Sequence, residues 1–298
     1  MLIAMAGVAV AKARKTRQGS VDGKVAKKAK AEKFDTNGAK DKTDKAESRY
    51  MVGSLSHGLN VIKAFDAEHR QMTLTQVAER TGMTRSGARR YLLTLAELGY
   101  VYHDGRLFRL SPKIMELGYS YLSSEPLTAI AQPYLDRLRN ETGETVGLAV
   151  LDDRHVVHIA RANSKLSLMA PTLTIGRRFP AIYTSTGRVM IALRPDADIG
   201  YFADVQNPAG TAPLRKLELE ALQNTLKKVE RDQYALVEQE LEVGVRTLAV
   251  PVRSQSGEVV SALNILTNIA KVEKDYLLKT CLPLLQAAAA DIQRAVVD

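Results

Sequence analysis

The chain has 298 residues, of which 45% are hydrophobic and 25% charged, so it is long enough and apolar enough for about two globular domains. Its formal net charge of +9 suits a nucleic-acid partner, whereas the single cysteine, Cys281, excludes an internal disulfide and a cysteine-based zinc site, as expected in the reducing cytoplasm. No run of ~18 or more apolar residues is present, which excludes a transmembrane helix and a membrane partner.

Positive charge is concentrated in an N-terminal tail, residues 1–53, which we predict to be disordered. Residues 11–50 contain 13 Lys/Arg and 6 Asp/Glu, a net +7, which leaves +2 for residues 51–298. This segment has too little apolar surface to offset its ordering entropy. It is either a basic arm that adds affinity for phosphates or a solvated tail with no role. Basic residues follow the apolar run at 1–10, the reverse of a Sec signal, so we expect no export and regard Met51 as an alternative start.

The next segment has the pattern of a winged helix-turn-helix domain, which we place at residues 54–115. Thr73 and Gln76 form a capping box before the second helix, and Gly82 can adopt the left-handed conformation of a tight turn. Asp104-Gly105 is a strong signal for a hairpin turn. The predicted elements are helices at 54–67, 74–81 and 84–98, followed by strands at 100–103 and 107–110.

The third of these helices has an apolar face and an arginine-rich face. Residues at three- or four-residue spacing predict the buried side: Ala88, Tyr91, Leu92, Leu95 and Leu98. The N-terminal half of such a helix enters the major groove, where arginine can hold guanine and Ser or Thr can contact bases or phosphates. We therefore expect a double-stranded DNA partner, and the alternative is a solvated polar face. The candidate DNA-binding residues are Thr84, Arg85, Ser86, Arg89 and Arg90 on the helix and Arg106 at the tip of the wing.

From residue 145 onward the pattern changes to a mixture of strands and helices, so the fold class is α+β. Two hairpins are predicted, 145–151 with 155–161 and 246–253 with 258–266. Helices are predicted at 111–122, 126–142, 184–193, 214–231 and 271–296. We place a linker helix at residues 116–130 and a second domain at residues 131–298.

Separate motifs in the two halves of the chain resemble the IclR family of bacterial transcriptional regulators. The N-terminal domain of that family is similar to SLSHGLNVIKAF…TLTQVAERTGMTRSGARRYLLTLAELGYV…FRLSPKIMELG. Its C-terminal domain is similar to GRRFPAIYTSTGRVMIA and LVEQELEVGVRTLAVPVRSQSGEVVSALNI. The resemblance covers residues 54–298 and leaves only the tail outside it.

This resemblance implies a winged helix-turn-helix followed by a GAF/PAS-like effector-binding domain. It also implies a homodimer or a dimer of dimers that binds a palindromic operator. Within the family, SLSHGLNVI and TIGRRFPAIYTSTGRV are most similar to the branch that regulates aromatic-acid catabolism through protocatechuate, p-hydroxybenzoate and the β-ketoadipate pathway. The implied effector is a small aromatic or dicarboxylic acid, and the implied function is control of a catabolic operon.

Carried over by position, the resemblance also implies an effector pocket at a helix start and on a sheet. Its predicted lining is Thr184, Ser185, Thr186, Val245, Thr247, Asn264 and Leu266. A carboxylate needs a cation or exposed N–H groups, for which Arg161, Arg178 and the helix start are candidates. The alternative for each arginine is a salt bridge. Leu266 stands where relatives have serine, which makes a dicarboxylate effector less favourable.

The remaining polar clusters do not predict a catalytic or metal site. His155 and His158 lie three apart on a predicted strand and therefore face opposite sides, so we expect ordinary surface or half-buried histidines. Glu238, Glu240 and Glu242 are expected to be exposed charges. No P-loop, G-x-G-x-x-G or G-x-S-x-G motif is present, so no cofactor and no enzyme is expected. The alternative class is a small-molecule hydrolase with an appended DNA-binding domain.

Overall fold

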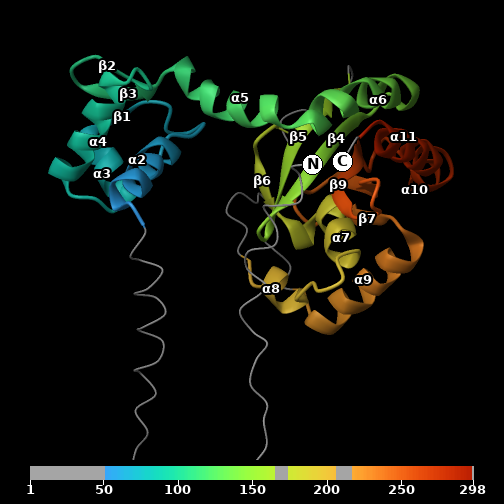
Figure 1. Cartoon of the computed structure of the whole chain (residues 1–298). Coiled ribbons are helices and arrows are strands. Elements are labelled where there is room, and N and C mark those ends of the chain that lie inside the picture. The colour runs from blue at the N-terminus through green and yellow to red at the C-terminus, as the bar shows by residue number, and fades with distance from the viewer. Residues whose placement is uncertain (1–50, 165–173, 206–216, 297–298) are drawn as a thin grey trace, which may run out of the picture. The chain divides into compact units, whose positions relative to one another are not determined.

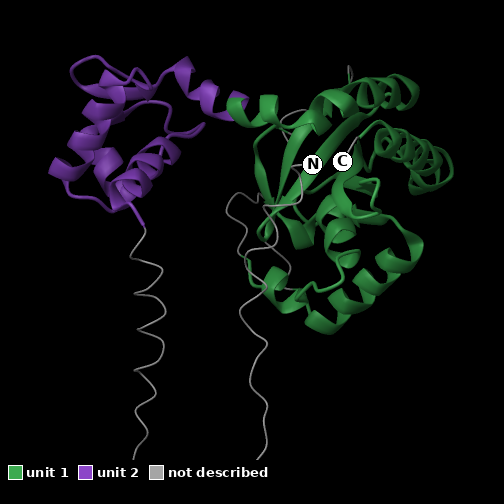
Figure 2. Ribbon diagram, viewed as in Figure 1, with its two compact units in different colours: residues 1–10, 120–298 green, residues 11–119 purple. Residues whose placement is uncertain are grey.

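The computed structural model describes residues 51–164, 174–205 and 217–296. These residues form two compact units, one ending at Tyr119 and the other beginning at Ser120 (Figure 2). Residues 1–50 of the predicted tail lie outside the described residues, as does the start of the helix predicted at 214–231. The unit border falls inside the range predicted as a linker, 116–130.

The N-terminal unit is a helix-turn-helix with a wing (Figure 1). Its elements are α2 (Gly53–Lys63), β1 (Met72–Thr73), α3 (Leu74–Thr81), α4 (Arg85–Glu97), β2 (Val101–His103) and β3 (Leu107–Leu110). The short strand β1 was not predicted, and it pairs with β3 to give the sheet order β1-β3-β2. The capping box of Thr73 and Gln76 begins α3 as predicted, and Gly82 ends it with φ 66°.

The core of this unit is built from one apolar face of each helix and the wing strands. Its fully buried members are Val61, Met72, Val77, Ala88 and Leu92. The first helix ends at Lys63, four residues before the predicted end. The reason is Asp66, whose Oδ1 accepts hydrogen bonds from the backbone N–H groups of Glu68 (2.9 Å) and His69 (2.7 Å) and turns the chain.

Gly82→Ala is expected to destabilise the N-terminal unit by about 1 kcal/mol, because an alanine is strained at a positive φ. The matched control is Gly58→Ala in the middle of α2, where an added Cβ meets no atom within 4 Å. There the gain in helix propensity predicts a stabilisation of about 0.5–1 kcal/mol. Thermal unfolding of the two variants should shift in opposite directions, and equal shifts would contradict the role assigned to the turn.

Two helices follow the wing in the chain. The helix predicted at 111–122 is divided into a 3-10 turn (Pro112–Ile114) and α5 (Met115–Ser124). The next helix, α6 (Pro126–Thr142), has the predicted bounds. Glu125 caps its start by accepting a hydrogen bond from the N–H of Leu127, and Gly143 ends it at φ 73°.

The C-terminal unit contains a six-stranded sheet in the order β6-β5-β4-β9-β8-β7, in which every neighbouring pair is antiparallel. The strands are β4 (Thr145–Asp152), β5 (His155–Ala162), β6 (Arg178–Pro180), β7 (Ala235–Glu238), β8 (Val245–Arg253) and β9 (Val259–Asn268). The predicted α+β fold is confirmed. The two edge strands, β6 and β7, were missed because three or four residues are too few to show alternation.

Helices cover both faces of this sheet (Figure 1). Leucines and valines of the strands, such as Leu148 and Leu248, pack against α6 and α11 (Leu282–Ala295). Alternate positions are small, among them Ala149, Ala249 and Ala262, and face the other layer. That layer consists of α7 (Ser185–Ala192), α8 (Ile199–Ala203) and α9 (Leu219–Asp232). The small residues let α7 lie close to the sheet.

The terminal helix predicted at 271–296 is interrupted. It consists of a short α10 (Lys274–Tyr276), a π-helical turn at Leu277–Cys281 and α11. The wide turn ends two residues before Pro283, which has no N–H to donate to a regular helical hydrogen bond. Across the described ranges, none of the helices has both the length and the apolar character needed to cross a membrane.

Candidate functional site

The first candidate site is the arginine face of α4. The helix buries Ala88, Leu92 and Leu95, which leaves the opposite side in solvent. Its exposed arginines, together with the one at the wing tip, are Arg85, Arg89, Arg90 and Arg106. Within the described part of the chain, none of these four guanidinium groups forms an ion pair or a side-chain hydrogen bond. They are therefore available for phosphates or bases.

The turn before α4 fixes where this face begins. The Oγ1 atom of Thr84 accepts a hydrogen bond from the N–H of Gly87 (3.1 Å) and lies 3.2 Å from Oγ of Ser86. A Cβ on Gly87 would lie 3.2 Å from the same Thr84 oxygen, so glycine leaves room for the cap. The primary role of Thr84 is therefore to cap the helix, and Ser86 remains exposed beside it.

The wing is held in shape by its own side chains. Oδ1 of Asp104 accepts hydrogen bonds from the N–H groups of Arg106 (3.0 Å) and Leu107 (2.7 Å), which also lower the pKa of Asp104. The guanidinium of Arg109 lies 4.4 Å from the centre of the Tyr102 ring. The wing thus presents Arg106 at a fixed turn, while Arg109 stacks within the protein.

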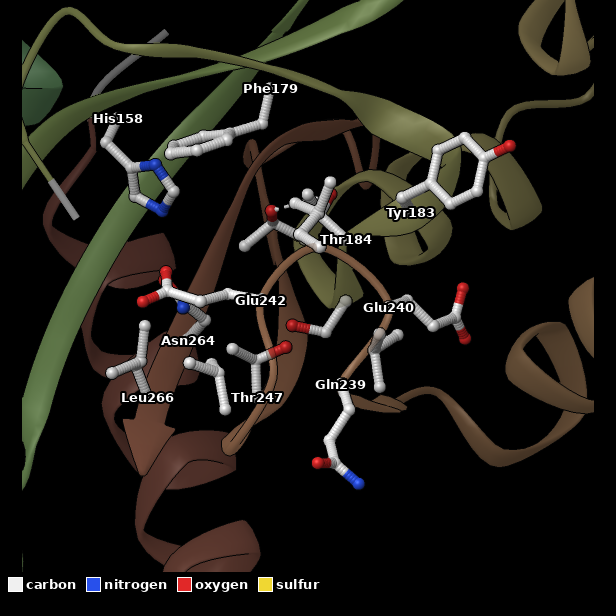
Figure 3. Close-up of a pocket in the computed structure, with 15 residues that line it drawn as sticks. His158, Phe179, Tyr183, Thr184, Gln239, Glu240, Glu242, Thr247, Asn264 and Leu266 are labelled. Atoms are coloured by element: carbon white, nitrogen blue, oxygen red, sulfur yellow. Dashed lines mark hydrogen bonds between the residues drawn. The ribbon is translucent and has the colours of Figure 1, made fainter. Parts of the chain in front are cut away.

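The second candidate site is a cavity of about 50 Å³ in the C-terminal unit (Figure 3). It is bounded by the start of α7, by strands β5, β8 and β9, and by the loop 239–244 between β7 and β8. All seven residues predicted at the helix start and on the sheet line it: Thr184, Ser185, Thr186, Val245, Thr247, Asn264 and Leu266. The structure therefore brings these seven residues together around one cavity.

The two predicted arginines do not line this cavity. Arg178 lies on β6 beside Phe179, and its guanidinium forms an ion pair with Asp152. Because side chains alternate along a strand, Phe179 faces the cavity and Arg178 does not. Arg161 lies on β5 opposite Gly147, which in turn pairs with Asn264. A bulge at Leu148/Ala149 thus places Arg161 on the sheet face of the cavity, but outside its lining.

The start of α7 is built by a close approach of two backbone segments. Oγ1 of Thr184 accepts a hydrogen bond from the N–H of Gly187 (2.9 Å) and donates one to the carbonyl of Ala181 (2.9 Å). A Cβ on Gly187 would lie only 2.1 Å from that carbonyl oxygen. Thr184, Ser185 and Thr186 at the helix start line the cavity, and the dipole of a helix favours a negative group near its N-terminus.

A buried histidine and a buried amide form the opposite wall. His158 and Asn264 are 3% and 2% exposed, and both line the cavity. Among the described residues, neither ring nitrogen of His158 nor Oδ1 of Asn264 has a hydrogen-bond partner of standard geometry, although the two side chains lie close enough to interact. Burial lowers the pKa of His158 to about 4, and the nearby Asn264 opposes that shift without reversing it. At neutral pH the imidazole is uncharged, so it can donate one hydrogen bond and accept another.

The expectation that His158 is a surface or half-buried histidine is therefore wrong. The same holds for two of the three glutamates, because Glu240 and Glu242 line the cavity from the loop 239–244. Glu240 accepts two hydrogen bonds from Arg188, at 2.8 and 2.6 Å, and Arg188 is 5% exposed. Glu238 forms an ion pair with Arg246 instead. These roles were missed because a polar run in a loop resembles a solvated surface.

In the described ranges, no group of three or more His, Cys, Asp or Glu residues is placed to hold a metal ion. Cys281 lies in the core against α11, where burial raises the pKa of its thiol to about 11. Such a thiol is a poor nucleophile at neutral pH.

A winged helix-turn-helix with an arginine face, joined to a second unit with a pocket, defines a ligand-responsive DNA-binding regulator. Residues 54–105 match the IclR helix-turn-helix domain, and residues 119–294 match the bacterial transcriptional regulator IclR C-terminal domain. The chain belongs to the IclR family of bacterial transcriptional regulators. It is not an enzyme, and the hydrolase alternative has no support.

Individual relatives agree with the aromatic-acid branch. The chain is 37% identical to the Pca regulon regulatory protein of Pseudomonas putida over 81% of this chain and 83% of that protein. It is 38% identical to a transcriptional regulator of Rhodococcus sp. RHA1, whose crystal structure superposes with a TM-score of 0.71 over 82% of this chain and 98% of that one. A double mutant of the PobR inducer-binding domain from Acinetobacter, solved with 3-hydroxybenzoic acid, is 30% identical with a TM-score of 0.50 over 57% of this chain and 98% of that one.

Proposed function

We propose that this regulator binds a palindromic operator as a homodimer or a dimer of dimers and controls a catabolic operon in response to a small aromatic acid. A two-fold symmetric protein places two recognition helices one or more DNA turns apart, which matches a palindrome. Its site of action would be the DNA of the bacterial cytoplasm. The observation that carries the proposal is the cavity at the start of α7, because its lining combines apolar walls with few polar groups.

We assign the effector carboxylate to the start of α7. Ser185 and Thr186 offer hydroxyl groups and helix N–H groups there, and both residues line the cavity. Arg178 is occupied by Asp152, and Arg161 lies outside the lining, so neither arginine is needed for this assignment. The apolar residues Val245 and Leu266, with the ring of Phe179, suit an aromatic ring.

On the DNA side we propose direct contacts from the exposed face of α4. Arg89 lies one helical turn after the Thr84 cap and is exposed, which suits a base or phosphate in the major groove. Arg85, Ser86 and Arg90 flank it on the same helix, and Arg106 of the wing suits the minor groove or the backbone. Effector binding would change operator affinity only if the effector has different affinities for two conformations of the protein.

The test is operator binding, with the operator first selected from random duplex DNA. Arg89→Ala is expected to weaken specific binding about tenfold to hundredfold and to reduce the salt dependence, because one charge contact is lost. The control is Arg231→Ala on α9, an exposed arginine that also removes one charge. Anisotropy titrations at several salt concentrations measure both. Unchanged affinity and salt slope for Arg89→Ala would refute the groove-facing role.

The same titrations with and without benzoate and hydroxybenzoates test the effector. A hydroxybenzoate should change the operator affinity of the wild-type protein, and the same ligand should raise its melting temperature. Operator binding that no aromatic acid affects would leave a DNA-binding protein without the proposed effector.

A further inference from the structure

The arginine face of α4 also contains an exposed apolar side chain. Leu93 is 36% exposed and lies one helical turn after Arg89, because residues four apart are neighbours on the surface of a helix. Arg90 and Ser86 precede Leu93 on the same side of the helix, at spacings of three and seven residues. Leu93 therefore belongs to the face that carries the candidate DNA contacts.

The apolar surfaces described for the N-terminal unit do not include Leu93. It is neither one of the buried core residues of this unit nor one of the partly buried residues that pack against them. The other exposed leucine of α4, Leu98, is 54% exposed and lines an apolar groove between α2 and α4 together with Leu55 and Leu59. Leu93 does not line this α2–α4 groove. Packing within the described residues thus gives no reason for a leucine at this position.

The charges around Leu93 indicate which partner covers it. Arg89 and Arg90 are exposed cations that precede it on the helix and suit phosphates or guanine. Glu97, one turn after Leu93, is exposed and carries a negative charge that disfavours a nearby phosphate. Leu93 is therefore the last residue before the end of the cationic stretch. In the major groove of DNA, the apolar group that such a side chain can contact is the 5-methyl group of thymine.

The position of Leu93 along α4 suits the same groove. Leu93 lies eight residues after Arg85, the first residue of the helix, which is about 12 Å along the axis at ~1.5 Å per residue. Successive base pairs are about 3.4 Å apart. A helix that lies along the groove can therefore bring Arg85 and Leu93 to bases that are up to about three or four pairs apart.

We propose that Leu93 contacts the 5-methyl group of a thymine in the major groove and thereby determines one base pair of each operator half-site. The inference rests on the proposed function, because it requires the arginine face of α4 to enter the groove. The arginines bind phosphates or guanine, whereas Leu93 distinguishes thymine from cytosine. Cytosine presents an amino group in the major groove and has no methyl group there.

The test uses the full-length protein and the operator selected from random duplex DNA. Each thymine of a half-site is replaced in turn by deoxyuridine, which removes only the 5-methyl group and keeps the base pair. Anisotropy titrations should show, at one position, an affinity loss of about fourfold for each half-site changed, as expected when one methyl group is withdrawn from an apolar contact. A selected half-site without a fixed thymine, or deoxyuridine tolerated at every position, would overturn the proposal.

Leu93→Ala connects the methyl group with the side chain. In a double-mutant cycle this variant should bind the thymine and deoxyuridine operators within about 1.5-fold of each other, because the contact is already lost. Leu93→Met keeps an apolar side chain and should retain most of the wild-type ratio. The control is Leu98→Ala, the same substitution at the leucine that lines the α2–α4 groove, which should leave the ratio at the wild-type value. An unchanged ratio in Leu93→Ala would refute the assignment.

Failure of this inference and failure of the proposed function give different results. If Arg89→Ala weakens operator binding but Leu93→Ala leaves the thymine-to-deoxyuridine ratio unchanged, the arginine face contacts DNA and only the role of Leu93 is wrong. If Arg89→Ala changes neither the affinity nor the salt slope, the groove-facing role of α4 is refuted as well. The melting temperature of Leu93→Ala should stay near the wild-type value, since the side chain is exposed and alanine favours a helix. A large decrease would show that Leu93 is a packing residue and would contradict the proposal.

Discussion

Gly187→Ala is expected to prevent stable folding of the C-terminal unit. The added Cβ would lie 2.1 Å from the carbonyl oxygen of Ala181 and 2.5 Å from its carbonyl carbon and Cα. These are backbone atoms in a buried turn, which is fixed by a hydrogen bond from the N–H of Ala181 to the carbonyl of Arg154 (2.9 Å). Relief requires α7 to move off the sheet, so a cost above about 3 kcal/mol is expected, a large share of a typical domain stability.

Gly118→Ala is the matched control for that substitution. Gly118 lies inside α5, where an added Cβ meets no atom within 4 Å, so alanine should be neutral or slightly stabilising. Urea unfolding of the full chain followed by circular dichroism separates the two outcomes. If the Gly187→Ala protein had the same urea midpoint of unfolding as the wild type, this would contradict the close approach of the Gly187 and Ala181 backbone segments.

Arg188→Met is expected to destabilise the C-terminal unit by about 2–4 kcal/mol. Arg188 is 6% exposed in its side chain, donates from Nε to the carbonyl of Ile182 (2.8 Å) and forms two hydrogen bonds with Glu240. Methionine fills the space but leaves the Glu240 carboxylate and the Ile182 carbonyl without their partner. Removing one member of a buried pair usually costs ~3–5 kcal/mol, and the partial exposure of Glu240 reduces that value.

The double variant Arg188→Met/Glu240→Gln distinguishes the unpaired charge from lost packing. Because the carboxylate is gone, part of the stability should return, and a double-mutant cycle gives the coupling energy. Arg231→Met removes an arginine from an exposed pair with Asp232 and should leave the unfolding midpoint nearly unchanged. If Arg188→Met and Arg231→Met have equal effects, the Arg188–Glu240 pair does not hold the loop to α7.

Local signals predicted the helices well, because their ends are encoded by neighbouring residues. α3 and α6 have the predicted bounds, and each has a cap at its start and a left-handed glycine at its end. The π-helical turn before Pro283 was not expected, since an apolar periodicity continues through it. The edge strands are recognisable only through their partners in the sheet.

The cavity was predicted in part. The seven lining residues came from motifs in contiguous stretches, around Thr184 and along β8 and β9. Contacts between distant segments were not foreseeable: Arg188 and Glu240 are 52 positions apart, and nothing near either residue indicates the other. His158 lies just before the strand bulge, and its burial depends on Phe179 of an edge strand that has no sequence signal of its own.

The size of the cavity has a consequence for affinity. A volume of about 50 Å³ holds only about four water molecules, so the cavity leaves a small aromatic acid little spare room. For any ligand that requires the loop 239–244 to be displaced, the apparent dissociation constant exceeds the intrinsic one in proportion to the rarity of the displaced form. The loop 239–244 begins and ends at left-handed residues, Gln239 and Gly244, and Arg188 on α7 is paired with Glu240 of this loop. For such a ligand, a stronger Arg188–Glu240 pair raises the effector concentration at which the regulator responds.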